Sequence, residues 1–274
     1  MRHVGVDVAR GAAVVSMFIA HTAPSGGPGG VLMLSEYLTF PLFALLIGVG
    51  AEFGGRSSTP REHFVSSVVR AGVLCAVGWF LPQAGAYVVI VLAPLGVLTL
   101  LCWALTKLPD VGVAGVVLIS GVFAPWSISA SQTLRTSVGL EGGPWEHWFL
   151  DLWVSPYYPQ LVLLAAGGVG VLLTRRLLPH SGPAREREAW VWALGLATVA
   201  VSLLAGDQWG WWAVAPYDTT AAEILLVLAL AGAVLCGAVY VGARSWAKVL
   251  PPVAWVGGMT LTLYVAQVGW LALW

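Results

Sequence analysis

Nine stretches of this chain are long and apolar enough to cross a lipid bilayer. A helix needs about 20 apolar residues to cross the hydrocarbon core, and backbone groups that face lipid must be paired within their own segment. The nine stretches are residues 4–22, 31–53, 64–82, 86–106, 111–128, 158–174, 189–205, 221–243 and 253–273. The sequence therefore predicts an all-α polytopic transmembrane helix bundle of about nine spans (eight to ten), in a single domain of residues 1–274.

The composition excludes an ordinary soluble protein. Charged residues make up 9% of the chain and hydrophobic residues 58%, whereas a soluble domain has about 25% charged residues. The 13 basic residues balance 13 acidic ones, which argues against a nucleic-acid-binding protein. The 3 cysteines are odd in number and lie within apolar stretches, so we expect neither a disulfide framework nor a bound metal.

The basic residues outside the spans lie mainly on one side of the membrane. On the side of the N-terminus are Arg2, Arg56, Arg61, Lys107, Arg175, Arg176, Arg185, Arg187, Arg244 and Lys248. Only Arg135 falls in a loop on the other side. Because loops rich in Lys and Arg stay in the cytoplasm, we expect a cytoplasmic N-terminus. Asn is absent and Arg greatly outnumbers Lys, which is typical of a GC-rich genome and favours the inner membrane of a bacterium.

Residues 129–157 form a long segment on the outer side. Its aromatic and apolar side chains recur at helical spacing at Trp145, Trp148, Phe149, Leu152 and Trp153. A helix with such a face lies in the membrane interface. We therefore expect an outer interfacial segment here.

The first span contains three ionisable residues, Asp7, Arg10 and His21. Such residues cost at least about 2.5–3.5 kcal/mol within a span and are candidates for function. At about 100° and 1.5 Å per residue, Arg10 and His21 share one helix face roughly 16.5 Å apart, with Arg10 nearer the cytoplasm. Alternatively, Asp7 and Arg10 form an i, i+3 ion pair near the interface and His21 caps the helix before Pro24.

Arg70 and Glu36 are the other ionisable residues that we expect inside the bundle. Arg70 lies in the third span at about the depth of Arg10. Two guanidinium groups at one depth suit a phosphate-bearing ligand, although snorkelling of Arg70 to the interface is an equal alternative. Glu36 enters the second span from the outer side near the level of His21, where a carboxylate would fix the imidazole tautomer and support a general base.

Polar groups also occur in the last span and before the eighth. Thr260, Tyr264 and Gln267 share one helix face, and such groups commonly form hydrogen bonds between membrane helices. Thr220 and Glu223 have the spacing of a capping box at the start of a helix. These residues therefore have a structural interpretation beside a functional one.

Several blocks of the sequence resemble one family of membrane enzymes. The first block is Asp7-Val-Ala-Arg10-Gly11-Ala followed by His21, in which the spacing from Arg to His is the specific part. The others are Phe40-Pro-Leu-Phe43 through Gly48-Val-Gly50, residues 61–70 and 86–98, Tyr158-Pro159, and Val256 through Gln267. Together they resemble the transmembrane acyltransferase superfamily, in particular its YeiB-like branch, which is related to heparan-α-glucosaminide N-acetyltransferases and membrane O-acetylases.

The resemblance implies an integral-membrane acyltransferase. Cytoplasmic acyl-CoA, such as acetyl-CoA, would thread its pantetheine arm into the bundle, and the acyl group would pass to a sugar, lipid or peptide acceptor on the outer side. Arg10, Arg70 and Asp7 would hold the CoA, and His21 and Glu36 would be catalytic. His21 would act as a general base or carry the acyl group itself. The residues expected to bind the acceptor are Tyr264, Gln267, Tyr217 and Asp218.

Two other functions stay open. A transporter or exporter of a small amphipathic molecule would use the polar face of the first span as its pathway. Many YeiB-like members have a Pro-His pair before the eighth span, where this chain has Pro216-Tyr217-Asp218. A catalytically inert membrane assembly subunit would fit that departure. Membrane lipid is a partner in every case, and a homo-oligomer is compatible with each.

Overall fold

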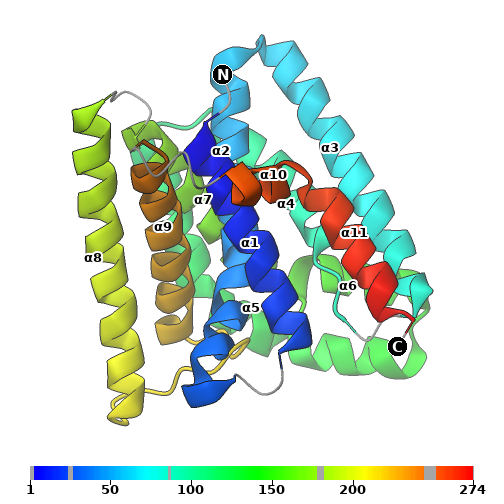
Figure 1. The fold of residues 1–274 in the computed structure, drawn as a ribbon. Coiled ribbons are helices and arrows are strands. Elements are labelled where there is room, and N and C mark those ends of the chain that lie inside the picture. The colour runs from blue at the N-terminus through cyan, green and yellow to red at the C-terminus, as the bar shows by residue number, and fades with distance from the viewer. Residues whose placement is uncertain (1–2, 24–26, 86–87, 178–181, 244–250, 274) are drawn as a thin grey trace.

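The computed structural model describes residues 3–23, 27–85, 88–177, 182–243 and 251–273, and within these ranges it contains no strand. The elements are α1 (Val4–Thr22), η2 (Pro28–Met33), α2 (Leu34–Ser57), α3 (Pro60–Phe80), η3 (Leu81–Ala84), α4 (Leu92–Leu105), α5 (Asp110–Glu141), α6 (Pro144–Val154), α7 (Gln160–Leu177), α8 (Pro183–Gln208), α9 (Ala221–Ala243), α10 (Pro251–Gly258) and α11 (Thr260–Leu271). Among the described residues, seven helical segments are long and apolar enough to cross a membrane. The predicted all-α polytopic bundle is confirmed (Figure 1).

The last predicted span is broken into two helices. α10 ends at Gly258 and α11 begins at Thr260, while Met259 between them has φ −113° and ψ 24°. Glycine has a low helix propensity, and Gly257 and Gly258 directly precede the break. The Thr260 hydroxyl donates a hydrogen bond to the Gly257 carbonyl at 2.8 Å, which satisfies a backbone acceptor at the end of α10. The prediction of one continuous helix over 253–273 is therefore wrong.

The outer segment also differs from its prediction. α5 is 32 residues long and continues to Glu141, so it takes up the first part of the segment 129–157. Only α6 forms a separate helix there. Arg135 on α5 holds α6 in place, because its guanidinium donates hydrogen bonds to the Asp151 carboxylate at 2.8 Å and the Val154 carbonyl at 3.1 Å.

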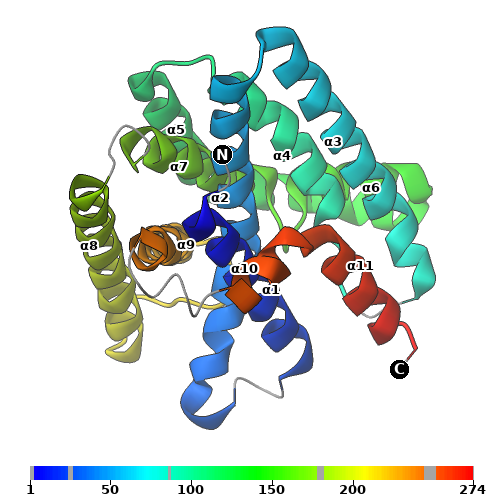
Figure 2. The same ribbon diagram turned by 45° about the horizontal axis from the view of Figure 1, so that its top comes forward.

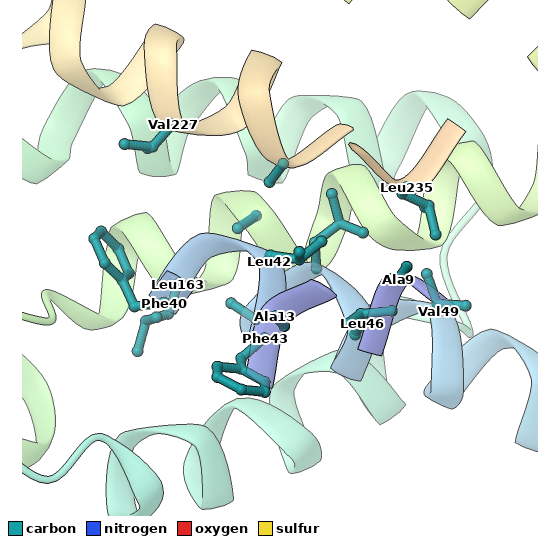
Figure 3. Close-up of a cluster of buried hydrophobic side chains, with 14 of the residues drawn as sticks. Ala9, Ala13, Phe40, Leu42, Phe43, Leu46, Val49, Leu163, Val227 and Leu235 are labelled. Carbon is teal, nitrogen blue, oxygen red and sulfur yellow. The ribbon is translucent and has the colours of Figure 1, made fainter. Parts of the chain in front are cut away.

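The core lies where α1, α2, α7 and α9 meet (Figure 3). Lipid is as apolar as the core, so membrane helices associate through van der Waals contact that small residues make possible. A Cβ on Gly48 of α2 would lie only 1.9 Å from the Gly167 carbonyl oxygen of α7. A Cβ on Gly170 would lie 2.1 Å from the Leu45 carbonyl oxygen. The glycines therefore let α2 and α7 pack backbone against backbone.

Glycines make a second close contact between α1 and α10. A Cβ on Gly11 would lie 2.1 Å from the Val253 carbonyl oxygen, and one on Gly257 would lie 2.0 Å from the Asp7 carbonyl oxygen. Figure 2 shows α10 lying against α1, with α11 leading away from it toward the edge of the bundle. This contact brings the start of α11 close to the turn of α1 that carries Arg10.

We expect Gly48→Ala to lower the free energy of unfolding by about 1–3 kcal/mol, because the added methyl group forces α2 away from α7. Thermal unfolding of the purified protein in detergent would measure the loss. Gly72→Ala on α3 is the matched control, since nothing lies within 4 Å of its Cβ position. It should be neutral or stabilising by up to about 1 kcal/mol, and equal unfolding temperatures for the two variants would contradict the packing argument.

Candidate functional site

A cavity of about 900 Å³ lies at the end of the bundle where α1 begins. We call this the inner end, since the sequence predicts that it faces the cytoplasm, and we call the cavity the inner cavity. Its walls come from α1, α2 and α3, with Thr99 of α4 and Thr260 of α11. Its volume lies within the range of about 300–1,000 Å³ that is usual for small-molecule sites.

Three arginines line the inner cavity, Arg10, Arg56 and Arg70. The structure thus brings together the two arginines that the sequence places at one depth. Arg10 also donates a hydrogen bond to the Asp7 carboxylate at 3.0 Å, so the i, i+3 ion pair forms at the cavity wall. The Asp7 side chain is 7% exposed and that of Arg10 is 38% exposed. Asp7 therefore holds the Arg10 guanidinium through one terminal nitrogen, Nη1, while the Arg10 side chain stays partly exposed.

Two histidines of the inner cavity were not predicted. Burial and the nearby Arg185 lower the pKa of His3, so this imidazole is uncharged at neutral pH. His63 of α3 is 4% exposed, and neither of its ring nitrogens has a hydrogen-bond partner in the described part of the chain. Its ring lies against Gly54 and Gly55, where a Cβ would come within 2.9 Å and 3.3 Å of it. No sequence pattern predicts this contact between His63 and the two glycines, because it depends on how α3 rotates against α2.

A partly buried ionic network lies beside the cavity at the inner end of α2, with Glu52 and Arg175 largely buried and Arg56 and Asp110 exposed. The Glu52 carboxylate accepts hydrogen bonds from Arg56 at 2.9 Å and from Arg175 at 3.0 Å. Arg175 also donates to the Asp110 carboxylate at 2.9 Å and to the Thr106 carbonyl at 3.1 Å. The sequence signal was available, since Glu52 is an ionisable residue within the predicted span 31–53. The network joins the inner ends of α2, α4, α5 and α7.

His21 lies at the opposite, outer end and contacts α11. Its Nδ1 is 3.2 Å from the amide nitrogen of Gln267. Among the described residues, no hydrogen bond or ion pair joins His21 to Glu36, so the predicted pair is not formed. The register of α1 against α2 explains this, because the Ser16 hydroxyl donates to the Ser35 carbonyl at 3.1 Å. Glu36 therefore sits at the level of Ser16, more than one turn away from His21.

Tyr264 and Gln267 are 4% and 2% exposed. The Tyr264 hydroxyl accepts a hydrogen bond from the Val91 N–H at 3.3 Å, and Gln267 contacts His21. The expected role of these groups in joining helices is confirmed for both. The expected role of Tyr264 and Gln267 in binding the acceptor stays a prediction.

Tyr217 belongs to a cluster of aromatic rings at the outer end. Its ring centroid lies 5.7 Å from that of Tyr157, 6.2 Å from that of Tyr158 and 6.1 Å from that of Phe40. Burial, followed by the charge of Glu36, raises the pKa of Tyr217 to about 12, so its hydroxyl is neutral at any physiological pH. The charge of Glu36 therefore acts on Tyr217.

The backbone around Tyr217 is held by Glu223. Tyr217 and Thr219 have φ angles of 69° and 54°, which are uncommon for residues other than glycine. The Glu223 carboxylate accepts hydrogen bonds from the Tyr217 N–H at 2.7 Å and from the Thr219 N–H, while the Thr220 hydroxyl accepts one from the Glu223 N–H. The predicted cap is thus present on the Thr220 side, and Glu223 serves the preceding loop. Asp218 is exposed in this loop.

Comparison with protein-family models, with curated proteins and with solved structures finds no match to this chain. The likeness to transmembrane acyltransferases therefore rests on the sequence blocks described above.

We expect Glu223→Ala to lower the free energy of unfolding by about 1.5–3 kcal/mol, because backbone hydrogen bonds to a charged group are lost. The loop before α9 should also become more sensitive to limited proteolysis. Glu146→Ala on α6 is the control, since Glu146 is exposed. Unchanged stability and unchanged cleavage in Glu223→Ala would show that the loop does not depend on this carboxylate.

Proposed function

We propose that the protein is an integral-membrane acyltransferase that moves an acyl group, such as acetyl, from cytoplasmic acyl-CoA to an acceptor on the outer side. The acceptor would be a sugar, a lipid or a peptide. One observation carries the proposal: α1 presents Arg10 to a cationic cavity at the inner end and His21 to Gln267 at the outer end. The sequence blocks that resemble transmembrane acyltransferases support the same assignment.

The inner cavity has the chemistry that the donor requires. CoA carries phosphate groups, and guanidinium forks bind phosphate oxygens in pairs of parallel hydrogen bonds. Arg10, Arg56 and Arg70 line the cavity, and among the described residues Asp7 is the one acidic residue that lines it with them. The N-terminus of α11 adds the positive end of a helix dipole at Thr260. Phosphates are thus expected at the inner end, with the thioester directed along α1.

The reaction proposed for His21 balances without a metal. The Nε2 lone pair takes the proton of the acceptor hydroxyl or amine, whose oxygen or nitrogen then attacks the thioester carbonyl. The carbon–sulfur bond breaks as the new ester or amide bond forms. The imidazolium returns its proton to the departing thiolate, which leaves as the CoA thiol. In the second route Nε2 itself attacks the thioester, and the CoA thiolate leaves as the acyl-imidazole forms. The acceptor then attacks this acyl group, its proton passes to the thiolate, and the imidazole is released.

The route from the inner cavity to His21 follows one face of α1. Val14 and Met17 lie on this face between Arg10 and His21, and each is 1% exposed. An acyl group that reaches His21 must therefore displace these two side chains. Methionine is unbranched and adapts readily to a changed packing, which suits Met17 to this position.

The break between α10 and α11 favours transport as a second candidate function. Discontinuous helices, whose free ends face the substrate, are common in secondary transporters. Here Met259 interrupts the helix beside the inner cavity, and Thr260 lines that cavity. Counterflow of a small amphipathic substrate in liposomes that lack acyl-CoA would support transport.

We expect Arg10→Ala and Arg70→Ala each to weaken binding of CoA by roughly 10- to 100-fold, since a hydrogen bond to a charged group contributes about 1.5–3 kcal/mol. Isothermal titration calorimetry of the protein in detergent would measure this. Arg187→Ala is the control, because Arg187 is exposed near the start of α8 and does not line the cavity. Wild-type affinity in both cavity variants would remove the proposed donor site.

We expect His21→Ala to lower acyl transfer by about 10²–10⁴-fold, the usual contribution of a general base, without weakening CoA binding. The measurement is release of the CoA thiol from acyl-CoA by purified protein with membrane extract as the acceptor source. His147→Ala on the exposed face of α6 is the matched control. A folded His21→Ala protein that transfers at the wild-type rate would show that His21 is not the catalytic group.

A further inference from the structure

Gln267 is the hydrogen-bonding neighbour that the structure gives to His21. Its amide nitrogen lies 3.2 Å from Nδ1 of the imidazole, and the residue is 2% exposed. The other amide atom, Oε1, has no hydrogen-bond partner in the part of the chain that the structure describes. A buried amide is therefore directed at one nitrogen of the imidazole and is not fully satisfied elsewhere.

Two orientations of this amide are compatible with the same side-chain position, because the oxygen and the NH₂ group are nearly identical in shape. If the NH₂ group faces His21, it donates to the Nδ1 lone pair, and the ring proton must lie on Nε2. If the oxygen faces His21, the Nδ1–H group donates to it, and Nε2 keeps its lone pair. Each orientation pairs one end of the amide, so burial alone does not favour either.

The chemistry of His21 distinguishes the two orientations. A general base or nucleophile needs the Nε2 lone pair before the reaction, which only the Nδ1–H tautomer provides. Once the imidazole has taken a proton, both ring nitrogens carry hydrogen. An NH₂ group facing Nδ1 would then oppose one donor with another, whereas the amide oxygen would accept the Nδ1–H hydrogen bond throughout. The oxygen-facing orientation is the one compatible with both protonation states.

We propose that Gln267 is the positioning residue for His21, and that its amide oxygen accepts the Nδ1–H hydrogen bond and leaves Nε2 free to react. This inference rests on the proposed function of His21. The groups that orient a catalytic imidazole usually act in this way, by fixing its tautomer and its ring plane. Because the amide is neutral, it does so without placing a charge inside the membrane.

The position of Gln267 is itself fixed by its helix. Tyr264 lies one turn earlier on α11, and its hydroxyl accepts the Val91 N–H hydrogen bond at 3.3 Å. Both residues are buried, whereas half of the residues of α11 are exposed. Tyr264 therefore holds the face of α11 that directs Gln267 toward His21.

The tautomer can be measured directly by ¹⁵N nuclear magnetic resonance of the full chain in detergent micelles, with labelled histidine. The His21 signals are those that disappear in His21→Gln. We expect a protonated Nδ1 and an unprotonated Nε2 in the wild type, and a shift of the proton toward Nε2 in Gln267→Leu. A proton on Nε2 in the wild type would overturn the proposal.

Transfer activity gives the second readout. We expect Gln267→Leu to lower the rate constant of acyl transfer by roughly 10- to 100-fold, as loss of an orienting partner commonly does, with unchanged affinity for CoA. Gln267→Glu keeps an oxygen toward Nδ1, so its rate should exceed that of Gln267→Leu, but it should stay below the wild-type rate because the carboxylate holds the proton on the imidazole more strongly. Gln132→Leu on α5 is the matched control, since Gln132 is exposed. Full activity of Gln267→Leu would also overturn the proposal.

The two readouts separate this inference from the proposed function. If the wild type transfers no acyl group, the proposed function fails, and the magnetic resonance spectrum still decides the tautomer. If the wild type transfers acyl groups while Nε2 carries the ring proton, the inference about Gln267 fails alone.

Discussion

The backbone contact between α1 and α10 is the constraint on which the arrangement of polar groups depends. A side chain on Gly11 or Gly257 would meet a carbonyl oxygen of the other helix at about 2 Å. Backbone atoms cannot move aside as a flexible side chain can, so only glycine allows this approach. α10 is thereby held against the first turns of α1. Because α11 begins directly after α10, Thr260 reaches the cavity that Arg10 lines.

This contact also joins the first and the last of the blocks that resemble acyltransferases. Gly11 belongs to the block that contains Arg10, and Gly257 belongs to the block that ends at Gln267. The glycines pack the two helices, while Arg10 and Gln267 supply polar groups at opposite ends of the contact region. One face of α11 then carries Thr260, which lines the inner cavity, and Gln267, which contacts His21. The spacing within each block thus reflects packing as well as chemistry.

The features that were predictable from the sequence depend on hydrophobicity and on position along a helix. The ends of α1 and α9 match the predicted stretches 4–22 and 221–243, since an apolar stretch between polar residues defines both ends. Arg10 and Arg70 were placed at one depth because each lies about six residues into its predicted span, 4–22 or 64–82; both line the same cavity, although α3 itself begins at Pro60. The glycine pair that breaks the last span was visible, but glycines elsewhere in the bundle, such as Gly48, lie within continuous helices.

The partners of the polar residues were less predictable, because they depend on how neighbouring helices rotate and slide against each other. Its expected depth in the membrane placed Glu36 beside His21. The hydrogen bond from Ser16 to Ser35 instead sets a register of α1 against α2 that puts Glu36 nearer the inner end than His21. The residue that contacts His21 is instead Gln267 of α11, which lies more than 240 residues away in sequence. His63 fits against Gly54 through the packing of α3 on α2. These contacts are tertiary, and no local pattern encodes them.

His21 has the Gln267 amide as its neighbour, where the sequence predicted the Glu36 carboxylate. This difference changes the chemistry that His21 can perform. A carboxylate at Nδ1 would stabilise the imidazolium strongly, and it would also have to stay charged inside the membrane. An amide stabilises the imidazolium less, so the proton that His21 takes is returned more readily to a leaving thiolate. Burial, followed by the charge of Glu36, instead raises the pKa of Tyr217 to about 12, so that hydroxyl stays neutral. Under the proposed function, charged groups hold the donor at the inner end, and neutral groups form the reaction centre at the outer end.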